Sequence, residues 1–178
     1  TLGPRRAPPF VDEGLAEVLS AARIGPQAVR IGVRGEHLAL LRSLAWLPFE
    51  RLADVGQRDP HYLDLAQARL FYAQAWATMF YALSPQTGAP QRVPSYLEAL
   101  RATDDVGASL ATGNVQSAES VVGQSAARAN EAIAQFLLGR TAPAELVIRL
   151  PTDRIDPALA VRRINSDEYD VRLAEMLL

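Results

Sequence analysis

The longest stretch of helical periodicity in this chain, residues 60–84, constrains its fold more than any other feature. Asp59 and Pro60 provide the capping residue and the first-turn proline of a helix start. Apolar residues then recur at the three- and four-residue spacing of one helix face, namely Leu63, Leu70, Phe71, Ala75, Met79 and Leu83. A face this long needs other helices to cover it, so the sequence predicts a mainly α fold.

Shorter periodic segments predict the remaining elements. We expect one helix from Phe10 to the Gly25-Pro26 pair, and others over about 35–45, 48–55, 93–103 and 115–138. Alternating side chains over 27–34 and an apolar run over 145–150 predict one or two short extended segments. A helix capped by Ser166 is expected to end the chain. The prediction is therefore a multi-helix, bundle-like lobe over residues 1–140, with an extended segment and a terminal helix over 141–178.

The composition excludes several functional classes. The chain has 178 residues, of which 49% are hydrophobic, and this is enough for one domain with a core. Its net charge is −2 and its 18 basic residues, all Arg, are spread along the sequence, which argues against a nucleic-acid partner. The lack of Lys and the many Ala are typical of a GC-rich bacterial gene. No Cys is present for a thiolate site, and no apolar run reaches the ~20 residues that span a membrane.

Residues 8–17, Pro-Pro-Phe-Val-Asp-Glu-Gly-Leu-Ala-Glu, form the most informative motif. This motif resembles the metal-ligand helix of the gluzincin zinc peptidases, most closely that of the bacterial peptidase-MA-like proteins. The resemblance implies that Glu13 is the third zinc ligand and that Gly14 lets two helices approach closely. It also suggests that Glu17 orients a histidine ligand as an outer-shell partner. The alternative is that Glu13 and Glu17 are solvated acidic residues near a helix N-terminus.

Residues 71–77, Phe-Tyr-Ala-Gln-Ala-Trp-Ala, form a second match to the same family. In related aminopeptidases a tyrosine of this helix donates a hydrogen bond to the tetrahedral oxyanion, and the resemblance implies this catalytic role for Tyr72. The alternative is that Tyr72 belongs to the core, as we expect for Phe71, Trp76 and Phe80. The recognisable resemblance covers roughly residues 8–83, and it also implies that the terminal helix of residues 141–178 is the start of a helical-repeat region.

The chain departs from the family because it lacks HExxH, whose two histidines bind zinc and whose glutamate is the general base. His37 and His61 have no second histidine at this spacing, and we expect both at helix ends rather than on a metal. In the family HExxH precedes the ligand glutamate by roughly twenty residues, whereas twelve residues precede Glu13. We therefore expect the chain to resemble the C-terminal half of a gluzincin domain, truncated after the HExxH helix. Zn²⁺ is expected in the intact parent protein and not on this chain alone.

Two functions stay open. The first is a bacterial zinc peptidase, in which this chain contributes Glu13 and part of a cleft for a peptide or protein substrate but is inactive without HExxH. The resemblance favours the periplasm or cell envelope for it, with the cytoplasm as the alternative. The second is a non-catalytic helical module that binds a protein partner or scaffolds an assembly. Self-association, or association with the missing N-terminal part, is a further expectation. In a complete module Phe10 and Leu15 should be covered by the chain's own core, whereas in a fragment they should face a gap.

Overall fold

The computed structural model describes residues 7–102, 114–141 and 143–150, which form a mainly helical body with a small three-stranded antiparallel sheet. The helices are α1 (Pro9–Ser20), α2 (Gly35–Ser43), α3 (Phe49–Asp54), α4 (Pro60–Leu63), α5 (Leu65–Leu83), α6 (Arg92–Ala102), α8 (Asn114–Val122) and α9 (Ala126–Leu138), with a 3-10 turn η1 (Pro85–Thr87) after α5. The strands are β1 (Ala22–Ile24), β2 (Ala28–Ile31) and β3 (Leu146–Arg149). The predicted mainly α fold is confirmed. Within the described residues no helix is both long and apolar enough to cross a membrane.

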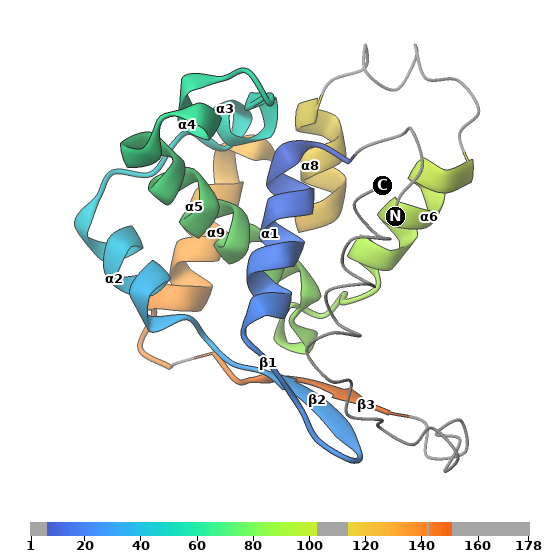
Figure 1. Ribbon diagram of the computed structural model, residues 1–178. Helices are drawn as coiled ribbons and strands as arrows, with labels where there is room; N and C mark the ends of the chain where they lie inside the picture. The colour runs from blue at the N-terminus through green and yellow to red at the C-terminus, as the bar shows by residue number, and fades with distance from the viewer. Residues whose placement is uncertain (1–6, 103–113, 142, 151–178) are drawn as a thin grey trace, which may run out of the picture.

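Helix α5 forms the centre of the core, with α1 and α9 beside it (Figure 1). Almost every side chain from Phe71 to Ala82 on this helix is buried, as in helices that other elements surround. Helix α1 makes the most extensive contact with α5. Ala75 and Met79 of the predicted apolar face are core residues, but the Leu63 side chain is 67% exposed and does not belong to that face.

Capping residues break both of the long helices that periodicity predicts. Asp64 has an extended backbone, and its carboxylate accepts hydrogen bonds from the first backbone N–H groups of α5, so a new helix begins there. Gly123 has a φ of 71° and ends α8. The Glu119 Oε1 atom then accepts a 2.7 Å hydrogen bond from the Ala126 N–H at the start of α9. The apolar spacing continues across both positions, which is why the breaks were not predicted.

The sheet has strand order β1-β2-β3 and lies at the lower edge of the helical body in Figure 1. Residues 22–24 were predicted as the end of the first helix, but they pair with 29–31 of β2, and the Gly25 N–H donates to the Ala28 carbonyl (2.9 Å) in the turn. Strand β3 lies beyond the predicted boundary at residue 140 and pairs with β2, which precedes it. Residues 146–149 therefore belong to the same sheet as residues 22–31. The predicted terminal helix lies outside the described residues.

Gln74 connects α5 to the segment before α3. Its Oε1 atom accepts a hydrogen bond from the Leu47 N–H (2.9 Å), and its Nε2 donates to the Leu47 carbonyl (2.8 Å). The Asn130 Nδ2 of α9 donates to the same carbonyl (2.7 Å). Since a buried amide must be paired to be tolerated, this arrangement gives Gln74 of the second motif a structural role.

Candidate functional site

Gly14 sets the distance between α1, which contains the first motif, and α5. A Cβ atom added to this glycine would lie 2.5 Å from the Ala75 carbonyl oxygen and 2.5 Å from the Met79 Cγ. The close approach that the glycine allows is therefore with α5. Glu13, the neighbour of Gly14, is brought by the same contact to the edge of α4 and α5.

The Glu13 carboxylate is half-buried and hydrogen-bonded. The Tyr62 hydroxyl of α4 donates to its Oε1 atom over 2.6 Å, a short bond of the kind that a charged acceptor makes. This bond, burial and the negative charge of Glu13 raise the pKa of Tyr62 to about 12. Glu13 therefore lacks the fully solvated surroundings that a simple acidic surface stripe would have.

Tyr72 of α5 lies in the same place and is half-buried. Its ring centroid is 6.2 Å from that of Tyr62 and 5.6 Å from that of Phe71. Burial and the negative charge of Glu13 raise the pKa of Tyr72, so its phenol keeps its proton at neutral pH. The fold thus brings Glu13 and Tyr72, from two motifs far apart in the sequence, together with Tyr62. We call these three residues the Glu13 cluster.

Glu17 lies one turn after Glu13 and has two partners from the start of α2. The Arg34 guanidinium forms an ion pair with the Glu17 Oε2 atom, and His37 Nε2 lies 3.0 Å from the same oxygen. The His37 ring packs against that of Trp76, with the centroids 5.4 Å apart. The histidine next to Glu17 is therefore His37, while an outer-shell role of Glu17 toward a zinc-bound histidine stays a prediction.

Three residues of this region, Tyr62, Arg34 and His37, were not predicted as site residues. Tyr62 follows the Asp59-Pro60 helix start, and a recognised break at Asp64 would have placed it on a separate turn. No local signal indicates Arg34 or His37, because their approach to Glu17 depends on the β1–β2 hairpin that reverses the chain.

Asp59 fixes the start of α4. Its Oδ1 atom accepts a hydrogen bond from the His61 backbone N–H and lies 2.9 Å from His61 Nδ1, while Arg51 forms an ion pair with Oδ2. His61 thus lies in the first turn of a helix, beside an aspartate cap.

Acid is expected to weaken this cap. Burial by itself would raise the pKa of Asp59, but hydrogen bonds from the His61 N–H and Arg51 lower that pKa from 3.8 to about 2. Because the pKa is lower in the folded protein, the ionised carboxylate stabilises the fold above pH 3.8, and this stabilisation is lost as the pH falls toward about 2. Asp59→Asn should remove this pH dependence, worth about 1 kcal/mol or less for a partly exposed pair. Urea unfolding at about pH 5 and about pH 2.5 measures it, and identical pH profiles for both proteins would contradict it.

The described residues do not complete a metal site by themselves. No group of three or more His, Cys, Asp or Glu side chains in this part of the chain is placed to hold a metal ion. Catalytic zinc in proteins usually has three protein ligands and one water. Glu13 provides the one carboxylate of the cluster, and its Oε1 atom accepts the Tyr62 hydrogen bond.

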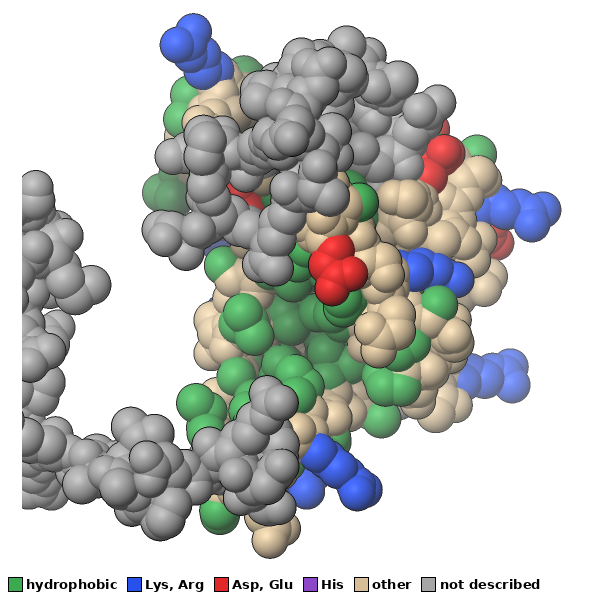
Figure 2. Space-filling view, turned by 90° about the vertical axis from the view of Figure 1, so that its right-hand side faces the viewer, with side chains coloured by type: hydrophobic (Ala, Val, Ile, Leu, Met, Phe, Trp, Pro, Cys, Tyr) green, Lys and Arg blue, Asp and Glu red, His purple; other side chains and the backbone are tan. Residues whose placement is uncertain are grey.

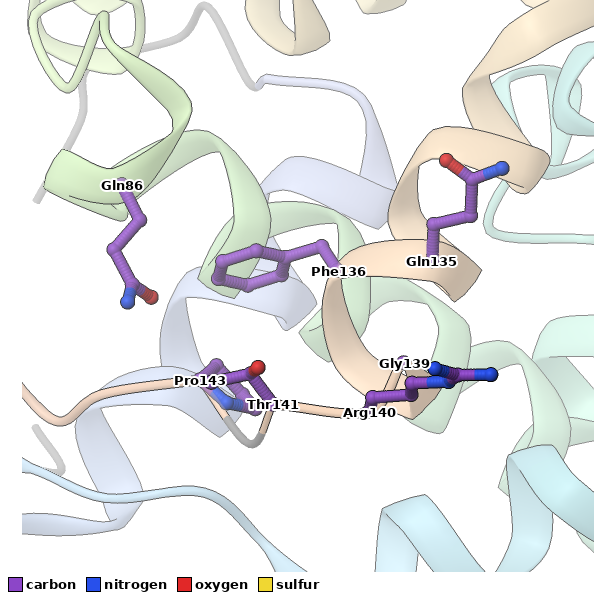
Figure 3. A pocket seen from close by; sticks show the side chains of 7 residues that line it. All are labelled: Gln86, Gln135, Phe136, Gly139, Arg140, Thr141 and Pro143. Atoms are coloured by element: carbon purple, nitrogen blue, oxygen red, sulfur yellow. The ribbon is translucent and has the colours of Figure 1, made fainter.

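A separate cavity of about 330 Å³ lies between η1 and the end of α9 (Figure 3). The residues that line it are Gln86, Gln135, Phe136, Gly139, Arg140, Thr141 and Pro143. These include no acid and no histidine, and none belongs to the Glu13 cluster. The lining offers neither metal ligands nor an acid–base pair, so this cavity is not the candidate site.

The candidate site is therefore the Glu13 cluster, with the Glu17–His37 contact one helical turn away. It combines a carboxylate of metal-ligand type with two protonated phenols on neighbouring helices. No protein-family model, curated protein or solved structure matches this chain, so the interpretation of the site as gluzincin-like rests on residues 8–17 and 71–83 alone.

Proposed function

We propose that this chain is part of a zinc-dependent peptidase and provides Glu13 as one zinc ligand. The two histidine ligands and the general-base glutamate would come from an HExxH segment outside this sequence, in a longer parent protein. The main support is the 2.6 Å hydrogen bond from Tyr62 to the half-buried Glu13 carboxylate, which holds this side chain in one position. The sequence of residues 8–17 also supports the proposal, because it resembles a gluzincin metal-ligand helix. The same proposal includes a fold like that of the C-terminal half of a gluzincin domain.

The residues of the cluster have distinct roles in this proposal. Zinc held by Glu13 and the two HExxH histidines would supply Lewis acidity toward a water molecule and the carbonyl of a peptide or protein substrate. Tyr72 keeps its proton at neutral pH and lies beside Glu13, so its hydroxyl is suited to donate a hydrogen bond to the oxyanion. Glu17 would orient the imidazole of a zinc-bound histidine, as its carboxylate now contacts the imidazole of His37. Arg34 holds the Glu17 carboxylate in place.

Zinc titration tests this function. The chain with the present sequence is expected to bind no stoichiometric zinc, because one carboxylate is too weak a site. The parent protein, with about thirty more residues upstream that include HExxH, is expected to bind one zinc ion tightly. Equilibrium dialysis followed by metal analysis measures both. Tight one-to-one binding by this chain alone, or no binding by the parent protein, would exclude the proposal.

A second function, a non-catalytic helical module that binds a protein partner, is favoured by the burial of Phe10. This side chain is 1% exposed and belongs to the chain's own core, as expected of a module that has no HExxH helix. In contrast, Leu15 is only partly buried and Leu19 is 56% exposed, as expected if another segment covers α1. Figure 2 shows hydrophobic side chains gathered in the middle of one face of the molecule, and exposed apolar patches are typical of partner-binding surfaces. Zinc binding by the parent protein distinguishes the two functions.

A further inference from the structure

Strand β3 lies at one side of the sheet and pairs with a single strand, β2, among the described residues. Its side chains Val147 and Ile148 are 45% and 52% exposed. An open strand edge presents a row of backbone N–H and C=O groups and is a template for a further strand. The free edge of β3 is therefore a candidate interaction surface.

The direction of the free backbone groups follows from the pairing of β3 with β2. The Leu150 N–H donates to the Gln27 carbonyl over 2.9 Å, so the backbone groups of residue 150 are turned toward β2. Because this direction alternates along a strand, the backbone groups of Glu145, Val147 and Arg149 are turned away from β2. We call these outward-turned groups the β3 edge.

The opposite edge of the sheet is a poorer template. Strand β1 is three residues long and runs directly into Gly25 and Pro26. Proline has no N–H to donate to a further strand. Pairing along β1 is therefore shorter than pairing along β3.

The sequence of β3 is complementary to itself in the antiparallel direction. When a two-fold axis passes through Val147, this residue faces its own equivalent, and Glu145 of each copy faces Arg149 of the other. Outward-turned residues then meet only outward-turned residues, as hydrogen-bonded antiparallel pairs require. Leu146 lies opposite Ile148 in the same register, so apolar side chains meet on the other side of the sheet.

The charges at the two ends of this register are placed to meet. The Glu145 side chain is 38% exposed and forms ion pairs with Arg23 and Arg30 of its own chain. These ion pairs place Glu145 on the side of the sheet that carries Arg30 and its partner Val147, and alternation places Arg149 there too. Arg149 is exposed and forms no ion pair with another described residue, so its guanidinium is available to a carboxylate of a second copy.

We propose that this chain forms a two-fold symmetric dimer through the β3 edge, in which two three-stranded sheets join into one antiparallel sheet centred on Val147. The partner is a second copy, because the order Glu-Leu-Val-Ile-Arg of residues 145–149 is complementary to itself. A contact between two such short segments is smaller than a standard interface, so the dimer is reversible and its fraction rises with protein concentration. This inference is independent of the proposed zinc function.

Two charge variants of the chain test the pairing of Glu145 with Arg149. In a homodimer, Glu145→Arg places arginine opposite arginine, and Arg149→Glu places glutamate opposite glutamate. Loss of two opposite-charge pairs should raise the dissociation constant of each variant by about 2- to 30-fold, and like-charge repulsion should raise it further. An equimolar mixture of the two variants restores both pairs and should dimerise as the unchanged chain does. Sedimentation velocity at low ionic strength, over a series of protein concentrations, measures all four samples.

A cysteine cross-link tests the register. The chain has no Cys of its own, and the Cα atoms of a hydrogen-bonded antiparallel pair lie about 5.5 Å apart, which is within disulfide range. Val147→Cys should therefore give a disulfide-linked dimer when a mild oxidant is added. Ile148→Cys is the matched control, since its side chain is similarly exposed but faces Leu146 of the second copy instead of its own equivalent. It should stay largely unlinked.

Three results would overturn the inference. The first is an unchanged chain that stays monomeric at every concentration. The second is self-association of both charge variants as strong as that of the unchanged chain, because the contact would then lie on another surface. The third is cross-linking through position 148 as efficient as through position 147, which would exclude the register centred on Val147.

Discussion

Glu13→Gln in the parent protein is expected to abolish zinc-dependent peptidase activity. Glutamine has the size of glutamate and can still accept the Tyr62 hydrogen bond, so the substitution removes the charge and the second carboxylate oxygen with little change in packing. Because the proposed function makes Glu13 a direct ligand, it predicts that zinc affinity falls by more than the ~10–100-fold typical of outer-shell partners. Chelator competition measures the affinity, and hydrolysis of an unstructured peptide measures the activity.

Glu50→Gln is the matched control for this experiment. Glu50 is an exposed acidic residue in the first turn of α3 and has the same chemistry as Glu13. The control should leave zinc affinity and activity unchanged, and both variants should unfold at the same urea concentration as the parent protein. If Glu13→Gln binds zinc as tightly as the control does, Glu13 is not a ligand and the non-catalytic module becomes the better interpretation.

Gly14→Ala is expected to destabilise the chain, although alanine is the better helix former by about 1 kcal/mol. The added Cβ would lie 2.5 Å from the Ala75 carbonyl oxygen, and backbone cannot move aside as the end of a side chain can. Overpacking of this kind typically costs about 1–3 kcal/mol. Urea unfolding followed by circular dichroism gives the change in the free energy of unfolding.

Gly35→Ala is the control for the glycine experiment. Gly35 begins α2, and a Cβ added there would meet no atom within 4 Å. This variant should be as stable as the unchanged chain, or slightly more stable through helix propensity. Equal stability of the Gly14 and Gly35 variants would mean that α1 and α5 lie farther apart than described here. Separation of these helices would also move Glu13 away from Tyr62, so Gly14→Ala should weaken zinc binding in the parent protein.

Sequence patterns predicted the helices of this fold better than their ends. Apolar spacing identified the central helix, because the buried residues of a helix recur every three or four positions in the sequence. The spacing also continues through Asp64 and Gly123, where a side-chain cap and a left-handed glycine end one helix and allow another to begin. Each helix end is marked by a single residue, whereas the apolar spacing involves many residues. The spacing therefore predicted one continuous helix in each case. The first helix was predicted too long for a different reason: strand pairing of residues 22–24 is a non-local interaction.

Some residues of the candidate site lie in sequence motifs, whereas others reach the site only through tertiary packing. Only the first kind could be named from the sequence. Glu13 and Tyr72 were named because the residues around them resemble family motifs, and their roles as metal ligand and oxyanion donor stay predictions. Tyr62, Arg34 and His37 could not be named, since their contacts with Glu13 and Glu17 cross between elements that the sequence does not connect. Partners of a carboxylate are set by tertiary structure, and a single sequence contains no direct trace of them.

The single turn of α4 determines when the Glu13 carboxylate is held by the Tyr62 hydrogen bond. This turn is held by its aspartate cap and by the Tyr62 ring, whereas Leu63, its last residue, and Leu65, the first residue of α5, are 67% and 83% exposed. A segment with so few buried contacts opens at a lower free energy than the packed helices around it. Opening of residues 59–64 would release the Glu13 side chain while α1 stays packed on α5. The fraction of molecules in which the Glu13 carboxylate is held by Tyr62 would then depend on the local opening equilibrium of one helical turn. Ligand binding can shift this equilibrium without unfolding the protein.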